Sequence, residues 1–143
     1  MARLSRCLQG ILLGVCIGIP PLGPVKAADS VAEFYKGKTI TIVVGTEAGN
    51  PYDVNARLIQ RFLPKHLPGN PSVIVTNMVG AGSMNAANYV YNVAAQDGTF
   101  INAASAPIPF LSLFDVKSAK FEAQKAYWLP VPTSETFTLS VWH

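Results

Sequence analysis

The stretch TITIVVGTEAGNPYDVNARLIQRF, residues 39–62, decides the fold of this chain. It begins with a β-branched, apolar run that ends at Gly45, which predicts a strand over residues 39–45 that is buried on both faces. A polar loop follows the strand, and apolar positions then recur at helical spacing. A buried strand that leads through a short loop into a helix is typical of an α/β unit.

The predicted helix carries its own start and stop signals. Asn50 suits the N-cap, Pro51 the first helical position, and Asp53 stands three residues after the cap in a variant of the capping box. Prolines and a glycine in KHLPGNP, residues 65–71, end the helix. The apolar positions that indicate the helix are Val54, Leu58 and Phe62, with the neighbouring Ile59 and Leu63.

The same alternation continues along the chain. SVIVTNM (72–78) is a second predicted strand, GAGS (80–83) a small-residue loop, and a second helix is expected from about Met84 to Ala95. A turn at QDGT (96–99), with Gly98 at its pivot, leads to a third strand, TFINAAS (99–105). Short connections between these elements predict right-handed crossovers and an α/β fold with a parallel sheet that has helices on both faces.

The pattern weakens after Ala106. A short apolar turn, PFLSLF (109–114), precedes a polar stretch with several lysines. Two later runs, YWLPV (127–131) and TFTLSVW (136–142), are strand-like.

The N-terminus has the layout of a secretory signal. Arg3 and Arg6 precede an apolar run of about a dozen residues, too short for the roughly 20 of a membrane-spanning helix. Small residues then indicate cleavage before Ala28, which makes residues 1–27 the signal. We expect a periplasmic or otherwise extracytoplasmic product with no direct membrane insertion after cleavage. A lipoprotein anchor at Cys16 is the competing interpretation.

Removal of this signal changes the charge and the thiol content. Of 11 Lys and Arg residues, Arg3, Arg6 and Lys26 leave, so eight remain against eight Asp and Glu, and the net charge is 8 − 8 = 0. A basic face for nucleic acid is therefore not supported. Both cysteines, Cys7 and Cys16, also leave, which excludes disulfides and thiol chemistry in the mature chain.

The segment AEFYKGKT, residues 32–39, fits a relaxed phosphate-binding pattern that ends in Lys38 and Thr39. A phosphate loop has to follow a strand and open a helix, because the amides of the loop and helix form the cradle. Here the pattern precedes a strand. We therefore interpret it as a solvated lead-in to the first strand, and we expect no nucleotide and no other cofactor.

Few residues suit catalysis. The mature chain has two histidines, His66 and His143, no cysteine and no GxSxG motif. This composition disfavours a zinc site, a thiol nucleophile and a serine hydrolase. We expect no metal, no catalytic residue and no enzyme activity.

Three loops follow the predicted strands: TEAGNPYD, MVGAGSMN and SAPIP. Ligands of open parallel sheets bind beyond the carboxyl ends of the strands, and the first amides of the following helices favour an anion such as a carboxylate. Asn50 and Ser83 also have a simpler interpretation as helix caps. Glu47 argues against a multiply charged ligand. Three tyrosines can line a pocket or pack in the core: Tyr52, Tyr89 and Tyr91.

Residues 34–101, with GTEAGNPYDVNARL, NMVGAGS and AAQDGT as their most specific parts, resemble the extracytoplasmic solute receptors of tripartite tricarboxylate transporters. The resemblance implies a periplasmic-binding-protein-like chain whose two α/β domains close on a small organic acid and deliver it to membrane permease subunits. It also implies that loop amides hold the ligand carboxylate. The implied ligand-binding residues are Thr46, Glu47, Ala48, Gly49, Asn50, Tyr52, Asp53, Gly80, Ala81, Gly82, Ser83 and Ser105.

Two features depart from that family. The first loop has Gly49-Asn50-Pro51 where the family commonly carries consecutive glycines, and Pro51 removes an amide donor. Family members are also much longer than 143 residues, so we assign residues 28–106 to a partial first domain and residues 107–143 to the crossover and start of a second. We expect such a part to bind organic acids weakly or not at all. The alternative is a truncated non-transport product or a standalone exported interaction module.

Overall fold

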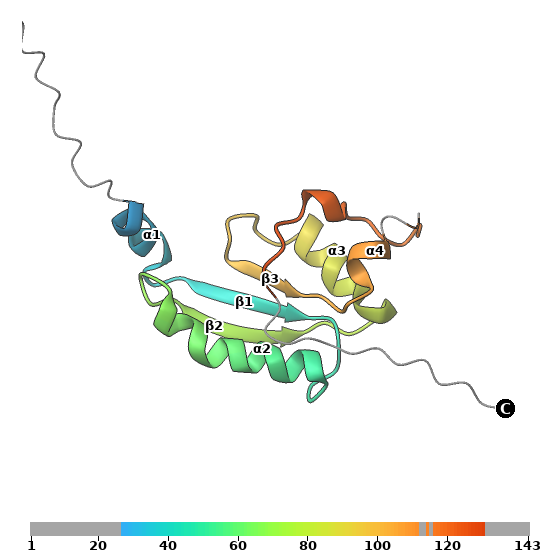
Figure 1. Ribbon diagram of the computed structural model, residues 1–143, viewed down its shortest axis with the longest axis horizontal. Helices are drawn as coiled ribbons and strands as arrows, with labels where there is room; N and C mark the ends of the chain where they lie inside the picture. The colour runs from blue at the N-terminus through green and yellow to red at the C-terminus, as the bar shows by residue number, and fades with distance from the viewer. Residues whose placement is uncertain (1–26, 112–113, 115, 131–143) are drawn as a thin grey trace, which may run out of the picture.

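The computed structural model describes residues 27–111, 114 and 116–130 of the chain. These residues form a three-stranded sheet with the strand order β2-β1-β3, in which both neighbouring pairs are parallel (Figure 1). The predicted α/β fold with a parallel sheet is thereby confirmed. The elements are α1 (Ala27–Tyr35), β1 (Thr39–Val44), α2 (Pro51–Phe62), a 3-10 turn η1 (Leu63–His66), β2 (Ser72–Asn77), a 3-10 turn η2 (Ala81–Ser83), α3 (Met84–Asn92), β3 (Phe100–Ala103), α4 (Ile108–Leu111) and a 3-10 turn η3 (Ala123–Lys125).

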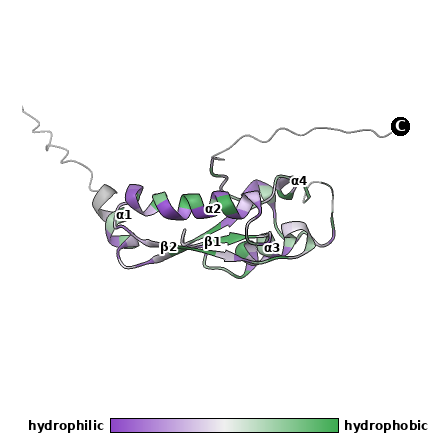
Figure 2. Ribbon diagram, turned by 90° about the horizontal axis from the view of Figure 1, so that it is seen from below, coloured by the Kyte–Doolittle hydropathy of each residue, from purple (hydrophilic) through white to green (hydrophobic). Residues whose placement is uncertain are grey.

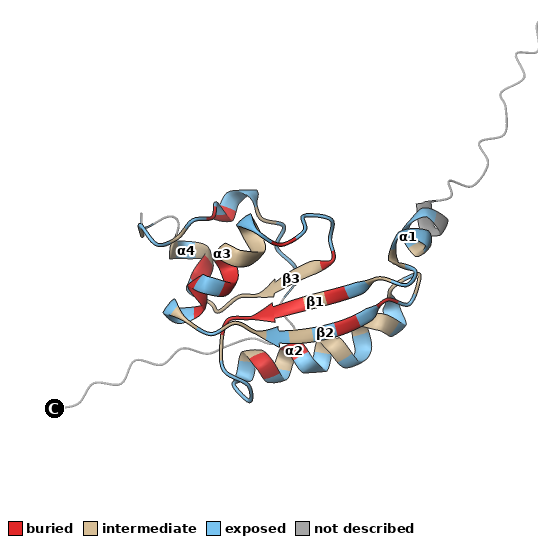
Figure 3. Cartoon of the chain, turned by 180° about the vertical axis from the view of Figure 1, so that it is seen from behind, coloured by how far each residue is buried: buried red, intermediate tan, exposed pale blue. Residues whose placement is uncertain are grey.

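Strand β1 is the centre of the fold because a strand lies on each side of it and helices cover both faces. Ile40, Ile42 and Val44 point to one face and Val43 to the other, as alternation along a strand requires. All four side chains are almost completely buried (Figure 3). The β-branched run therefore behaves as the predicted strand with two covered faces.

Helices α2 and α3 lie on opposite faces of the sheet (Figure 2). The chain steps from β1 to β2 in one direction and then back past β1 to β3, so right-handed crossovers place the two helices on different sides. Beneath α2, one core cluster joins β1 residues to Ala56 and Val73. On the side of α3, a second cluster joins Met84 and Ala87 to residues of the later segment, Ile108, Phe121 and Ala123.

Both ends of α2 follow the local sequence signals. Asn50 is the N-cap, its side-chain oxygen accepts a hydrogen bond from the Tyr52 amide, and Pro51 occupies the first turn. Past the 3-10 turn η1 the chain reverses through Gly69 and Asn70, both with positive φ. The predicted start and end of this helix are confirmed.

The set of apolar positions that indicated α2 divides into two stripes. Ile59 and Leu63 pack against the core, but Val54, Leu58 and Phe62 are 55%, 52% and 44% exposed. The apolar spacing therefore located the helix but not its buried face. Both stripes have helical spacing, and only the position of the sheet decides which one is buried.

Four other expectations differ from the structure. Helix α3 ends at Asn92 rather than near Ala95, and β3 is confined to Phe100–Ala103. Residues 127–130 form no strand, while the second strand-like run, 136–142, lies outside the described residues. The lead-in to β1 contains an unpredicted helix, α1, in whose first turn the predicted cleavage position falls. Within the described ranges, no helix is long and apolar enough to cross a membrane.

Gly45, directly after β1, permits the closest approach between two segments of the fold. A Cβ atom at this position would lie 2.6 Å from both the Cα and the Oγ of Ser83, and closer still to the Ser83 Cβ. No real Cβ tolerates such contacts, so any other residue at position 45 must push the loop before α3 away from the strand end.

We expect Gly45→Ala to destabilise the protein by about 2 kcal/mol, the cost of overpacking a closely packed site. The measurement is urea denaturation of the purified protein. The matched control is Gly37→Ala, where the added Cβ meets nothing within 4 Å and only the positive φ of 71° opposes the change, at about 1 kcal/mol. Equal losses for the two variants would contradict the predicted clash.

Candidate functional site

Three loops meet at the carboxyl edge of the sheet, because parallel strands all end on the same side (Figure 1). They are residues 45–50 after β1, 78–83 after β2 and 104–107 after β3. The strand order β2-β1-β3 also puts the point where the chain changes direction between β1 and β3, and ligands of open α/β sheets bind outside such a point.

Direct contacts join these loops. The Ser105 hydroxyl donates to the Gly82 carbonyl at 3.4 Å, which connects the third loop to the second. The Ala106 amide donates to the Tyr52 hydroxyl oxygen at 3.2 Å, which connects the third loop to the start of α2. Together with the Gly45–Ser83 approach, these contacts bring all three predicted loops to one place.

The Asp53 carboxylate fixes the first loop. One of its oxygens accepts from the Gly49 amide and from Arg57 Nε, and the other accepts from Asn77 Nδ2, each at 2.9 Å. Asn77 Nδ2 also donates to the Thr46 carbonyl at 3.0 Å, and Arg57 Nη2 donates to Asn77 Oδ1 at 3.2 Å. Asp53 is 1% exposed. Its role in the structure is to hold the loop, because protein donors occupy both of its oxygens.

This network differs from the expected capping box. A capping box pairs the third helical residue with the amide of the N-cap residue. Here Asp53 bonds to the amide of Gly49, one residue earlier, and the Asn50 amide donates to the Glu47 carbonyl at 3.3 Å. Gly49 has a φ of 86°, which turns its amide toward the carboxylate.

Several amides of the first loop and of the start of α2 are occupied within the protein. The Gly49, Asn50 and Tyr52 amides each have an internal acceptor, and Pro51 has no amide hydrogen. Within the described part of the chain, the amides of Glu47 and Ala48 donate to no acceptor. These two exposed residues are the part of the first loop that can offer donors to a ligand.

The second loop is a left-handed turn. Gly80, Ala81, Gly82 and Ser83 have φ angles of 138°, 47°, 61° and 75°, and the Ser83 amide closes the turn on the Gly80 carbonyl at 3.1 Å. A non-glycine residue in this region costs about 1–2 kcal/mol, and such strain concentrates at functional sites. Ser83 occupies the predicted N-cap position of α3, but its side chain makes no capping hydrogen bond.

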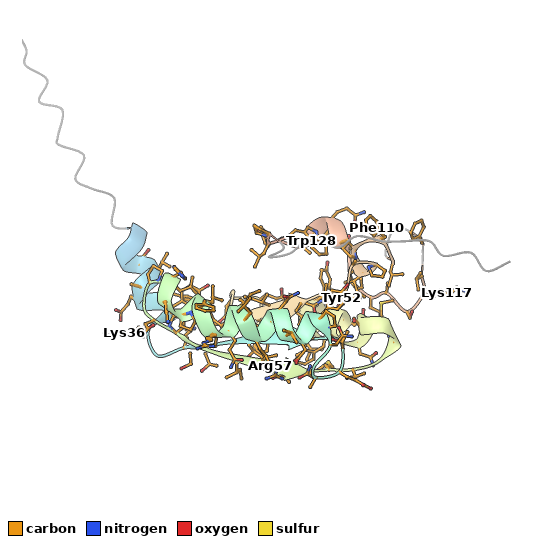
Figure 4. All side chains as sticks on the ribbon, turned by 60° about the horizontal axis from the view of Figure 1, so that its bottom comes forward. Lys36, Tyr52, Arg57, Phe110, Lys117 and Trp128 are labelled. Atoms are coloured by element: carbon orange, nitrogen blue, oxygen red, sulfur yellow. The ribbon has the colours of Figure 1, made fainter. Side chains whose placement is uncertain are left out.

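The tyrosines divide between the site and the core. Tyr52 lies at the site through its hydroxyl, and Figure 4 shows it on the opposite side of α2 from Arg57. Tyr89 packs edge-on against Phe100, and Tyr91 packs against Phe121, both with ring centroids 6.4 Å apart. The packing interpretation of these last two tyrosines agrees with the structure.

Arg57 and Asn77 are the site residues that were absent from the predicted set. A signal for each was present in the sequence. Arg57 stands four residues after Asp53, the spacing of a helical ion pair, and Asn77 is the polar last residue of a strand whose middle residues, 73–75, are apolar. What the sequence did not show is that a loop amide and two side chains from different elements meet at one carboxylate.

Residues outside this edge do not form a competing site in the described structure. Lys38, from the phosphate-loop pattern, lies at the amino end of β1, with its Nζ 3.7 Å from an Asp97 oxygen and 4.3 Å from the centre of the Phe34 ring. Among residues 27–111, 114 and 116–130, no group of three or more His, Cys, Asp and Glu side chains lies close enough to hold a metal ion.

No protein-family model matches this chain, and a search of curated proteins likewise finds no match. The function therefore has to be argued from the geometry of the three loops and from the chemistry of their residues.

The Asp53 network makes the stability dependent on pH. Hydrogen bonds from Arg57, the Gly49 amide and Asn77 lower the pKa of Asp53 below its usual range, which is near 3.9 in an unfolded chain. The lowered pKa means that this stabilisation is complete above the unfolded value and is lost as the pH falls toward the folded value. We expect the urea concentration at the midpoint of unfolding to decrease as the pH is lowered below about 4. The decrease should be smaller in Asp53→Asn.

The control for this experiment is Glu47→Gln, which removes an exposed carboxylate of the same loop that has no hydrogen bond or ion pair with the described residues. Its acid-induced loss of stability should match that of the wild type. If Asp53→Asn and the wild type lose stability equally between pH 5 and pH 2, roughly the range over which a carboxylate titrates, Asp53 does not hold the loop.

The strain of the second loop is also testable. Ala81→Gly removes a side chain from a residue at φ 47°, so we expect a stability gain of up to about 1 kcal/mol, reduced by the greater chain entropy of glycine. The control, Ala86→Gly within α3, should lose at least about 1 kcal/mol. Urea denaturation measures both variants, and a loss for Ala81→Gly would contradict the left-handed turn.

Proposed function

We propose that this chain forms the ligand-binding part of an extracytoplasmic receptor that captures a small organic acid for a transporter of the tripartite tricarboxylate type. The observation that carries the proposal is the meeting of three strand-end loops at one edge of the sheet. In this interpretation the chain has no catalytic role, and the ligand is later handed to membrane permease subunits.

The proposed ligand contacts come from two kinds of donor. Main-chain amides of Glu47, Ala48, Ala81 and Gly82 are exposed and have no acceptor within the described residues. Amides at the start of a helix, as those of the second loop are, favour a carboxylate because the positive end of the helix dipole adds to their hydrogen bonds. The left-handed turn before α3 is strained in the way that ligand-binding loops often are.

The Glu47 side chain limits the charge of the proposed ligand. It stands on the first loop, next to an unoccupied amide, and no ion pair with a described residue neutralises it. A second or third carboxylate on the ligand would meet this charge, and like charges at short range repel. A monocarboxylate therefore fits the loops better than a tricarboxylate does.

Export and periplasmic location belong to the same proposal. They are supported by the layout of the first 27 residues, which has a basic start, a short apolar run and small residues before Ala28. Sequence resemblance over residues 34–101 supports the receptor family and the permease partner.

The experiment is a titration of the isotope-labelled protein with lactate and with citrate, followed by amide chemical shifts in NMR spectra. We expect lactate to shift the amides of residues 46–52, 80–83 and 104–106 with a dissociation constant in the millimolar range, about 1 mM or weaker, because one set of loops cannot enclose a ligand. Citrate should bind several-fold more weakly, and Glu47→Gln should reduce that difference.

Two results would overturn the proposal. The first is the absence of shifts in these loops at lactate concentrations well above the millimolar range. The second is a set of shifts equally large at the amino edge of the sheet, around Asp97, which would indicate a nonspecific salt effect. A micromolar dissociation constant would show instead that the described loops form a complete pocket.

A further inference from the structure

Helix α2 presents an apolar stripe that the described structure leaves about half exposed. Val54, Leu58 and Phe62 stand four residues apart along the helix, and each has about half of its surface exposed. At 1.5 Å per residue the stripe extends over about 12 Å. Hydrophobic and hydrophilic bands alternate along α2 in Figure 2.

The charged residues beside this stripe are all basic. Arg57, Arg61 and Lys65 are exposed, and the only acidic residue of α2 and η1 is the buried Asp53. The Arg61 guanidinium lies 5.9 Å and the Lys65 ammonium 5.5 Å from the centre of the Phe62 ring. These contacts keep two positive charges at the end of the apolar stripe.

The internal contacts of α2 show that this surface is separate from the three-loop site. Asp53 and Gln60 bond to β2, through Asn77 and the Val73 carbonyl, and Tyr52 bonds to the third loop. The helix is thereby fixed in rotation, and the second apolar stripe faces away from the sheet. An exposed apolar row on a rigid helix, rimmed by charge, marks an interaction surface.

We infer that this stripe, defined as Val54, Leu58 and Phe62 with Arg61 and Lys65, binds an amphipathic helix of a partner protein whose apolar residues are flanked by carboxylates. Apolar positions at i, i+4 and i+8 match the spacing by which one helix recognises another. Arg57 is already paired with Asp53 at 2.9 Å, whereas Arg61 and Lys65 have no ion pair with a described residue. These two unpaired cations favour a partner of opposite charge. The inference goes beyond the proposed ligand binding and does not depend on it.

The charges and the burial of the stripe disfavour two other occupants. In a symmetric dimer each copy presents the same patch, so the cations of one stripe would face the cations of the other. A membrane surface requires apolar side chains that reach into the lipid. Those of the stripe are already about half buried against their own protein.

The test uses two synthetic helical peptides with the same leucine stripe, one flanked by glutamates and the other by lysines. We expect the acidic peptide to bind the protein with a dissociation constant weaker than about 1 µM, since three side chains form a small interface. NMR shifts should centre on residues 54–62. The basic peptide should bind at least about tenfold more weakly. Added salt should weaken the binding of the acidic peptide to the protein.

The decisive variant is Leu58→Glu, which should abolish acidic-peptide binding. The matched control is Ile74→Glu, at a residue that is 45% exposed and pairs with Thr41 on the opposite face of the sheet; it should leave binding unchanged. Sedimentation velocity and vesicle binding are measured in parallel, with phosphatidylglycerol and phosphatidylcholine vesicles.

Three kinds of outcome overturn the inference. Equal affinity for the two peptides, or no binding of either, rules out an acidic helix as the partner. A dimer that Leu58→Glu dissociates would make the stripe a self-association surface. Binding to phosphatidylglycerol vesicles without binding to the peptide would make it a membrane surface. By contrast, binding of the acidic peptide in the absence of lactate shifts would overturn the proposed ligand site and leave this inference standing.

Discussion

The absence of a side chain at Gly45 is the constraint on which the carboxyl edge of the sheet depends. It lets Ser83 lie against the end of β1, where a Cβ on residue 45 would come within 2.6 Å of the Ser83 Cα. The left-handed turn before α3 is costly in isolation, and such turns persist only where the surrounding packing determines them. Here the end of β1 and the hydrogen bond from Ser105 to Gly82 provide that packing.

A second constraint, the rotation of α2, links the inner site to the outer surface. Asp53 binds Asn77, and Gln60 donates to the Val73 carbonyl at 3.1 Å, so one flank of the helix is fixed to β2. The same rotation directs Tyr52 toward the third loop. It leaves Val54, Leu58 and Phe62 exposed, so the network that holds the first loop also determines which apolar residues face solvent.

Local chemistry made much of this fold predictable. The β-branched run before Gly45 favours a buried strand through its own side chains, and Asn50 followed by Pro51 favours a helix start through contacts within a few residues. The position of the candidate site could be predicted for a similar reason, since parallel strands must end together. The role of each loop residue could not be predicted. A carboxylate such as that of Asp53 can bind a ligand or cap a helix. In the structure its hydrogen-bond partners include Asn77, 24 residues away.

The sequence by itself determined the order of strands and helices, the parallel sheet and the edge at which the loops gather, because these follow from periodicity and from short connections. Only the tertiary structure decided which of two equally spaced apolar stripes of α2 is buried, that Ser83 takes a left-handed conformation without capping α3, and that Asp53 is consumed in holding its own loop. The physical reason is that periodicity is a property of neighbouring residues. Burial and hydrogen-bond partners depend on distances between segments far apart in the chain.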